Sequence, residues 1–301
     1  MRFINGATGN TITNTVILGA SSNSVATDGA TILFSTDTVT ANGNDNNTIS
    51  NNVILLTGVG LHSKAILCMG STGTAAIGNS GLVITNNTIS DYFSPTTTSA
   101  GVAFNVGCST STITNNRFYL SSPRTWTTGA LQSAIFLNGS SDPTGVQGMT
   151  ITGNIIGYSS NTQSGTYQLS GGGTANGSFR GISFTGITGG AVSDISNNTI
   201  TAVSLTDVTS SGTSSSAPLM GIFVSAGVVN SNGNIIGSLS ATGSITHLTN
   251  AATTSEVYGI QNFGNDNWTA NNNNVSGATR ANATAVNNYI LTLRPCISFS
   301  A

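Results

Sequence analysis

Carboxylates are the first residues of this chain that could do chemistry, because two of them at close range supply a general acid and a base or nucleophile. The chain has 9 Asp and Glu residues, spread along its 301 residues. Asp45 and Asp266 each lie in a Gly-Asn-Asp-Asn phrase at the same register, but several repeats of the chain separate them. Asp91 and Asp207 do not align. We therefore expect turn-forming aspartates and assign no catalytic residue.

The densest mixture of cations and aromatic residues lies between residues 117 and 126. Arginines can form ion pairs with carboxylates, and exposed aromatic rings can stack on sugar rings. The candidate ligand-binding residues are therefore Arg117, Tyr119, Arg124 and Trp126. Phe118 falls on a core position of the repeat described below, and Tyr119 and Trp126 have a plain alternative, which is to cover a loop against the wall of the fold.

Histidine and cysteine give no metal site. His62, Lys64 and His247 have no acidic partner nearby in the sequence, so we expect each on the surface. The 3 cysteines lack metal-type spacing, and neither a disulfide framework nor a zinc site follows from them. Cys68 and Cys108 share the parity of neighbouring apolar residues, which favours buried small hydrophobes. We expect no metal and no cofactor.

A repeated phrase must position all of these residues. It reads apolar, Thr or Ser, Asn, Asn, any residue, apolar, as in Ile84-Thr85-Asn86-Asn87-Thr88-Ile89. Its final apolar residues, at 17, 54, 89, 118, 156, 200, 236 and 275, are 29 to 44 residues apart. A period of this size is typical of a solenoid, a propeller or an array.

Each period offers about three strand-sized segments of alternating apolar residues. One begins with a small residue, as in Gly181-Ile182-Ser183-Phe184, and the other two precede and follow the asparagines. Polar Ser, Thr and Gly stretches between them are expected loops. The pattern predicts an all-β, right-handed parallel β-helix of about eight coils with three short strands per coil. We expect one domain over residues 1–289 and an irregular end over residues 290–301.

The asparagines have a physical reason in such a coil. A tight bend needs a left-handed backbone conformation, which Asn tolerates, and stacked side-chain amides can form a ladder along the axis. The predicted ladder comprises Asn14, Asn51, Asn52, Asn86, Asn87, Asn115, Asn116, Asn154, Asn197, Asn198, Asn234, Asn272 and Asn273.

Composition excludes several partners. A net charge of -2 with only 5% charged residues gives no field for nucleic acid, and no apolar run is long enough for membrane insertion. The start lacks the apolar stretch of a secretion signal, and we expect a piece of a longer chain or a mature segment.

The repeat resembles the pectin-lyase-like superfamily of right-handed parallel β-helices, especially the Asn-rich repeats of large secreted or surface proteins in Bacteroidetes-type bacteria. The resemblance covers roughly residues 10 to 280. That superfamily holds lyases, hydrolases, tailspikes, adhesins and stalks, so it implies architecture more than activity.

The expected function is a non-catalytic, extracellular structural or adhesive segment of a larger bacterial secreted protein. Its expected partners are glycans or cell-surface polysaccharide and the flanking domains of the same chain. The alternative is a polysaccharide-active enzyme, either a lyase or a glycoside hydrolase. A minor alternative is ice binding, because Thr recurs on both sides of the inward Ile, as in Thr112 and Thr114. Irregular coil lengths argue against it, since they would put loops near a flat face.

Overall fold

The computed structural model describes residues 1–21, 29–35, 42–58, 60–71, 73–139, 145–210, 212, 214–238, 244–249, 255–264 and 266–282. The expected irregular end, residues 290–301, lies outside these ranges. The described chain is all-β apart from two short 3-10 turns, η1 (Ala75–Ile77) and η2 (Ser214–Ser216). It forms three parallel sheets of eight strands, a fourth of five and a small pair.

The strands are assigned to the sheets as follows. Sheet A contains β1 (Arg2–Phe3), β4 (Ile32–Ser35), β7 (Lys64–Met69), β11 (Ser99–Phe104), β16 (Leu131–Asn138), β20 (Ser178–Thr185), β24 (Leu219–Ala226) and β28 (Val257–Asn262). Sheet B contains β2 (Thr11–Thr13), β5 (Thr48–Ser50), β9 (Val83–Thr85), β13 (Thr112–Thr114), β17 (Thr150–Thr152), β21 (Ser193–Ser196), β25 (Val229–Asn230) and β29 (Trp268–Thr269). Sheet C contains β3 (Val16–Gly19), β6 (Val53–Leu56), β10 (Thr88–Ser90), β14 (Arg117–Tyr119), β18 (Ile155–Gly157), β22 (Thr199–Thr201), β26 (Ile235–Ile236) and β30 (Asn274–Val275). Sheet D contains β15 (Arg124–Thr125), β19 (Tyr167–Ser170), β23 (Val203–Val208), β27 (Ile245–Thr249) and β31 (Ala278–Asn282), and β8 (Asn79–Ser80) pairs with β12 (Cys108–Ser109).

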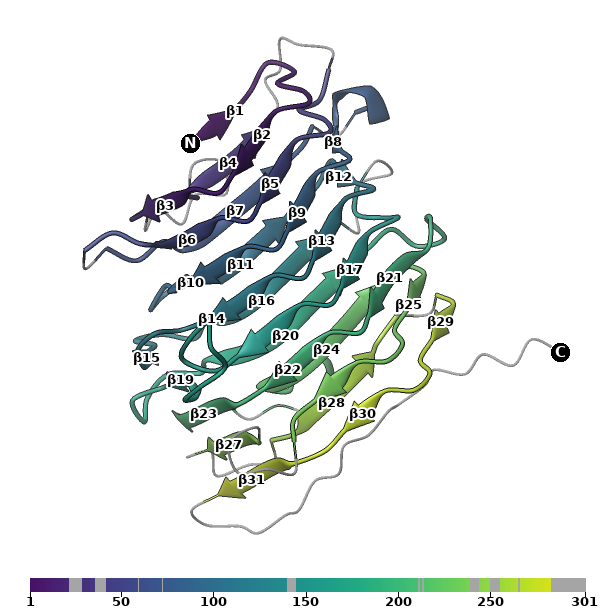
Figure 1. Ribbon diagram of the computed structural model, residues 1–301. Helices are drawn as coiled ribbons and strands as arrows, with labels where there is room; N and C mark the ends of the chain where they lie inside the picture. Colours follow the sequence, from purple (N-terminus) through teal and green to yellow (C-terminus); the bar gives the residue numbers. More distant parts are fainter. Residues whose placement is uncertain are drawn as a thin grey trace, which may run out of the picture.

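The chain winds through these sheets in a fixed order. It passes through sheets B, C and A in turn, with sheet D inserted between C and A from β15 onward, and each strand pairs in parallel with its equivalent in the next coil. Figure 1 shows the strands as successive rungs from the N-terminal to the C-terminal end. The prediction of an eight-coil β-solenoid with three strands per coil is therefore confirmed.

The core consists of aliphatic residues stacked in register. Ile84 of β9 pairs with Ile113 of β13, and Ile89 of β10 pairs with Phe118 of β14. These four side chains are at most 1% exposed. Burial of such rows supplies the main driving force for winding the coil, at about 25 cal/mol per Å² of apolar surface. Phe118 occupies the core position expected for it.

The two asparagines of the phrase have different roles. The first turns the corner between sheets B and C with a positive φ, as at Asn86 and Asn115 (both 56°), and Gly153 takes its place in another coil (69°). The second points inward and carries the ladder. Its described members are Asn52, Asn87, Asn116, Asn154, Asn198, Asn234 and Asn273. The first-position residues of the predicted set, Asn14, Asn51, Asn86, Asn115, Asn197 and Asn272, have positive φ instead.

The strand segments that begin with a small residue, such as Gly181 or Gly101, lie in sheet A, and the small residue is explained by close packing of sheet A on sheet C. An added Cβ at Gly181 would lie 2.8 Å from Cδ1 of Ile200, and at Gly101 it would lie 2.6 Å from Cδ1 of Phe118. Ala65 and Ala134 occupy the same row in other coils. Little space is left for a side chain in this row, because both sheets place apolar side chains in the same interior.

A disulfide joins Cys68 and Cys108, 40 residues apart in the sequence. Both cysteines are buried, as the parity of their neighbours predicts. The expectation of buried, unlinked hydrophobes is wrong in its second part, because consecutive coils bring the two thiols together on the interior side. Such a bond is typical of an oxidising compartment.

Candidate functional site

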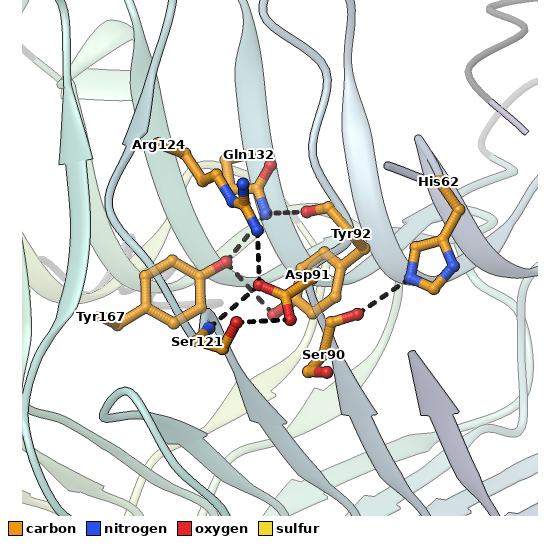
Figure 2. A network of polar contacts seen from close by, with 8 residues as sticks. All are labelled: His62, Ser90, Asp91, Tyr92, Ser121, Arg124, Gln132 and Tyr167. Carbon is orange, nitrogen blue, oxygen red and sulfur yellow. Dashed lines mark hydrogen bonds and ion pairs between the residues drawn. The ribbon is translucent and has the colours of Figure 1, made fainter. Parts of the chain in front are cut away.

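A network of buried polar side chains lies at the turn from sheet C toward sheet A, in the middle of the solenoid (Figure 2). Tyr92 and Tyr167 are both fully buried, and the hydroxyl of Tyr167 donates to that of Tyr92 at 3.2 Å. The side-chain amide of Gln132 donates to the Tyr167 hydroxyl at 2.8 Å and to the backbone carbonyl of Tyr92 at 2.6 Å. Ser99 donates to the Gln132 carbonyl oxygen. The four side chains form one hydrogen-bonded chain across three coils.

Burial determines the protonation of the two phenols. Desolvation raises the pKa of Tyr167 and, together with the neighbouring Tyr167 hydroxyl, raises the pKa of Tyr92 well above its usual value. Both therefore remain neutral hydrogen-bonding groups. Because these hydroxyls have no contact with solvent, the arrangement fixes the core and offers no surface for a substrate.

An ion pair lies beside this set of hydrogen-bonded side chains. Asp91, with a left-handed backbone (φ 58°), follows β10, and its carboxylate accepts from Nη2 of Arg124 at 2.8 Å. Ser121 donates to the same carboxylate through its backbone N at 3.0 Å and its hydroxyl at 2.8 Å. The side chains of Arg124 and Asp91 are 18% and 5% exposed. Asp91 thus anchors the turn of the next coil, and its role as a turn residue agrees with the sequence interpretation.

His62 lies near this network but belongs to the preceding coil. Its Nε2 lies 2.9 Å from the carbonyl oxygen of Ser90, and its Nδ1 lies 2.9 Å from the hydroxyl of Thr31. The ring has no exposed surface. Burial lowers the pKa of His62, while the Ser90 hydrogen bond and the negative charge of Asp91 oppose that shift.

The predicted surface positions of His62, Lys64 and His247 are therefore wrong. Lys64 is 8% exposed, and burial lowers its pKa. His247 is fully buried, with Nε2 2.9 Å from the hydroxyl of Ser255.

The predicted ligand-binding cluster is divided between two environments. Arg117 and Tyr119 point outward from β14, on either side of the buried Phe118, and both are half-buried. With its amide oxygen turned toward Arg117, Gln163 accepts from both terminal guanidinium nitrogens at 3.0 and 3.2 Å. Arg124 is engaged with Asp91.

Trp126 is placed in the interior. It is 1% exposed and packs against Phe93, with ring centroids 6.1 Å apart. A glycan cannot stack on a ring so enclosed. The plain alternative for Trp126, covering a loop against the wall, is what the structure shows, and its partner Phe93 was not singled out in the sequence.

Asp45 and Asp266 also hold backbone segments of neighbouring coils. Asp45 accepts from the backbone N and hydroxyl of Ser80, and Asp266 accepts from the backbone N of Gly227 at 2.7 Å and of Gly189 at 3.1 Å. Among the described residues, no three His, Cys, Asp or Glu side chains are grouped as a metal site requires. Within the same ranges, no helix is long and apolar enough to span a membrane.

The outer face of sheet B carries a grid of hydroxyls. Thr112 pairs with Thr150 and Thr114 with Thr152, and both pairs flank the inward isoleucines. The same two rows include Thr11, Thr13, Thr48, Ser50, Thr85 and Ser196, but Val83 and Asp194 interrupt the row of Thr112 and Thr150. From β2 to β22 only two residues separate each sheet B strand from the following sheet C strand, so the variable loops lie at other corners. The connections from sheet A to sheet B are longer, as in residues 186–192, so loops do lie at the opposite edge of this face, as the irregular coil lengths predict.

Comparison of the chain with protein-family models, curated proteins and solved structures found no match. The assignment to a parallel β-solenoid therefore rests on the sheet topology, and the functional argument rests on the chemistry of the described surface and core.

Proposed function

We propose that this chain is a non-catalytic structural and adhesive segment of a larger extracellular bacterial protein, built as a stiff rod that presents contacts along its surface. One observation supports this most strongly. Seven asparagines form a continuous and largely buried ladder from the second coil to the last, alongside three sheets that run from the first coil to the last. Every coil is thereby bonded to its neighbours at several points around its circumference.

The ionisable residues agree with a passive role. Of the described carboxylates discussed above, Asp45 and Asp266 bind backbone N–H groups and Asp91 pairs with Arg124. Each of these interactions stabilises a turn. The disulfide between Cys68 and Cys108 agrees with an extracellular location, as does the resemblance to Asn-rich repeats of secreted β-helical proteins.

Force spectroscopy tests the rod directly. The chain is pulled by its two ends, and we expect stepwise extension at forces that fall when the ladder is interrupted by Asn116→Ala. Release at low force with no steps would contradict the structural role. Incubation with a panel of plant and bacterial polysaccharides, assayed for reducing ends and for unsaturated products, tests the enzymatic alternative. Release of product above that of heat-denatured protein would contradict the non-catalytic part.

Ice binding is a second candidate, and the hydroxyl grid on sheet B is the observation that favours it. One outward row, from Thr13 to Ser196, consists of Thr and Ser in six coils at the spacing of parallel strands, about 4.8 Å, and the tight corner beside it leaves that edge of the face uncovered. Suppression of ice recrystallisation by the chain, lost on Thr114→Tyr, would support it. The matched control is Thr88→Tyr on the outer face of sheet C. No suppression by the unmodified chain would eliminate this function.

A further inference from the structure

A pocket of about 340 Å³ lies on the outer face of sheet C, toward the C-terminal coils. Its lining includes Tyr158, Thr199, Thr201, Ile235, Asn274 and Ser276. No residue discussed above as a candidate ligand contact contributes to it. The volume falls at the lower end of the range typical of small-molecule sites.

The floor of the pocket consists of outward side chains from three stacked strands. Thr199 of β22 pairs with Ile235 of β26, and Ile235 pairs with Asn274 of β30. A hydroxyl, an aliphatic group and an amide are thus presented in line, about 4.8 Å apart. Ile235 is 44% exposed although it is large and apolar.

One wall of the pocket is Tyr158, at the beginning of a loop that leaves β18. Its φ is 63°, a left-handed conformation that is uncommon for a bulky side chain. Its backbone N donates to the carbonyl of Ala202 at 3.3 Å, so the residue is bonded to the next coil. Strain of this kind costs free energy and is retained where the surroundings fix it, often at functional sites.

The loop that carries Tyr158 is closed on itself and on the solenoid. The backbone N of Ser159 donates to the carbonyl of Ser164 at 3.0 Å, and Gln163 reaches back to Arg117. The preceding Gly157 lies against β22 so closely that an added Cβ would be 1.7 Å from the carbonyl oxygen of Thr201. These contacts hold the tyrosine beside the floor before any ligand binds.

The lining is chemically specific. It combines one aromatic ring, one exposed aliphatic group, an amide and hydroxyls, and it contains no Lys, Arg, Asp or Glu. A sugar ring presents C–H groups on its faces and hydroxyls at its edge, which match an aromatic wall and hydroxyl or amide partners respectively. Without a cation in the lining, an acidic sugar would lose hydration of its carboxylate and gain no ion pair.

We propose that this pocket binds a neutral saccharide, with the ring of Tyr158 against a sugar face and with Thr199 and Asn274 bonded to sugar hydroxyls. The inference rests on the adhesive part of the proposed function and gives it a ligand class and a location. It also moves the contact away from Trp126, which is buried.

The test uses the full chain, immobilised and titrated with defined gluco-, manno-, galacto- and xylo-oligosaccharides, and with oligogalacturonate as the acidic probe. We expect at least one neutral oligosaccharide to bind and oligogalacturonate to bind more weakly. Tyr158→Asn removes the ring while tolerating the positive φ, and Thr199→Trp fills the pocket from the floor. Each should weaken binding by at least about tenfold, equivalent to about 1.4 kcal/mol.

Thr88→Trp is the matched control for Thr199→Trp, because Thr88 of β10 occupies the same outward register position of sheet C three coils earlier. It should leave affinity unchanged, and the thermal unfolding midpoint of every variant is measured alongside. The proposal is overturned if no neutral oligosaccharide binds, if the acidic probe binds best, or if folded variants at Tyr158 and Thr199 both retain affinity. If no saccharide binds but unfolding under force is stepwise, only the saccharide proposal fails and the structural role is retained. If a saccharide binds but unfolding shows no steps, only the structural role fails.

Discussion

Asn87 and Asn116 are stacked in adjacent coils, with the side-chain N of Asn87 donating to Oδ1 of Asn116 at 3.0 Å. The backbone N of Asn87 donates to the same oxygen at 2.9 Å. The second amide hydrogen of Asn87 reaches the carbonyl of Ile49 in the preceding coil at 2.8 Å. One buried amide thus links three coils, and repetition of this unit specifies the register of the whole solenoid.

Removing one amide of the ladder should destabilise the fold strongly. Asn116→Ala leaves the carbonyl of Ile84 and the backbone N of Asn87 without their partner, and both are buried. Since each unsatisfied buried group costs about 1–3 kcal/mol, we expect the free energy of unfolding to fall by about 2–4 kcal/mol. Urea denaturation followed by circular dichroism measures it. A loss below about 0.5 kcal/mol would show that the ladder is dispensable.

The neighbouring asparagine should respond to a different change. Asn115 is exposed and has a φ of 56°, which Gly adopts freely and Val does not. We expect Asn115→Gly to change the free energy of unfolding by less than about 1 kcal/mol, and Asn115→Val to lower it by about 1–3 kcal/mol. The thermal unfolding midpoints of the two variants provide the comparison. Equal effects of Gly and Val would contradict the assigned backbone role.

Acid should destabilise the protein through His62. Because burial lowers its pKa in the folded state, the unfolded chain binds the proton more readily, and stability is lost as pH falls below about 6.5. One such group contributes at most about 1.4 kcal/mol per pH unit. Unfolding free energies at pH 7 and pH 5 should therefore differ less in His62→Gln than in the unmodified chain. An unchanged difference would mean that His62 does not titrate in this range.

The disulfide predicts a redox-dependent stability. Cys68→Ala combined with Cys108→Ala should lower the free energy of unfolding by about 2–4 kcal/mol, because the bond closes a segment of 40 residues in the unfolded chain. Adding a reductant to the unmodified protein should have a similar effect and should have none on the double variant. Titration of thiols in the denatured, unreduced chain should find only Cys296. Three free thiols would contradict the bond.

The repeat explains why the fold was predictable. Each of three consecutive residues indicates one feature of the coil: Thr85 the strand, Asn86 the left-handed corner and Asn87 the ladder. The motif recurs often enough to define the register. The small residues at the start of the sheet A strands form a visible pattern in the sequence. Their cause, contact with sheet C, is seen only in the close approach of Gly181 to Ile200.

The details of the site were harder to predict, because they depend on which coil covers which loop. Trp126 and His62 lie in polar sequence contexts, yet Phe93 packs on the first and Thr31 and Ser90 enclose the second. The partner of Cys68 was equally hidden, since coil length varies and parity alone does not bring Cys108 beside it. Only the stacked coils supply these neighbours.

Engineered cross-linking tests the stacking most directly. Thr114 pairs with Thr152 in the next coil, and Thr152 pairs with Ser196 in the coil beyond. Paired positions are about 4.8 Å apart, within the range for a disulfide, while positions two coils apart are about 9.6 Å apart and outside it. On mild oxidation, Thr114→Cys with Thr152→Cys should form a bond that peptide mapping detects, and Thr114→Cys with Ser196→Cys should form none. A bond in the second pair, or none in the first, would contradict a solenoid of coils stacked in this register.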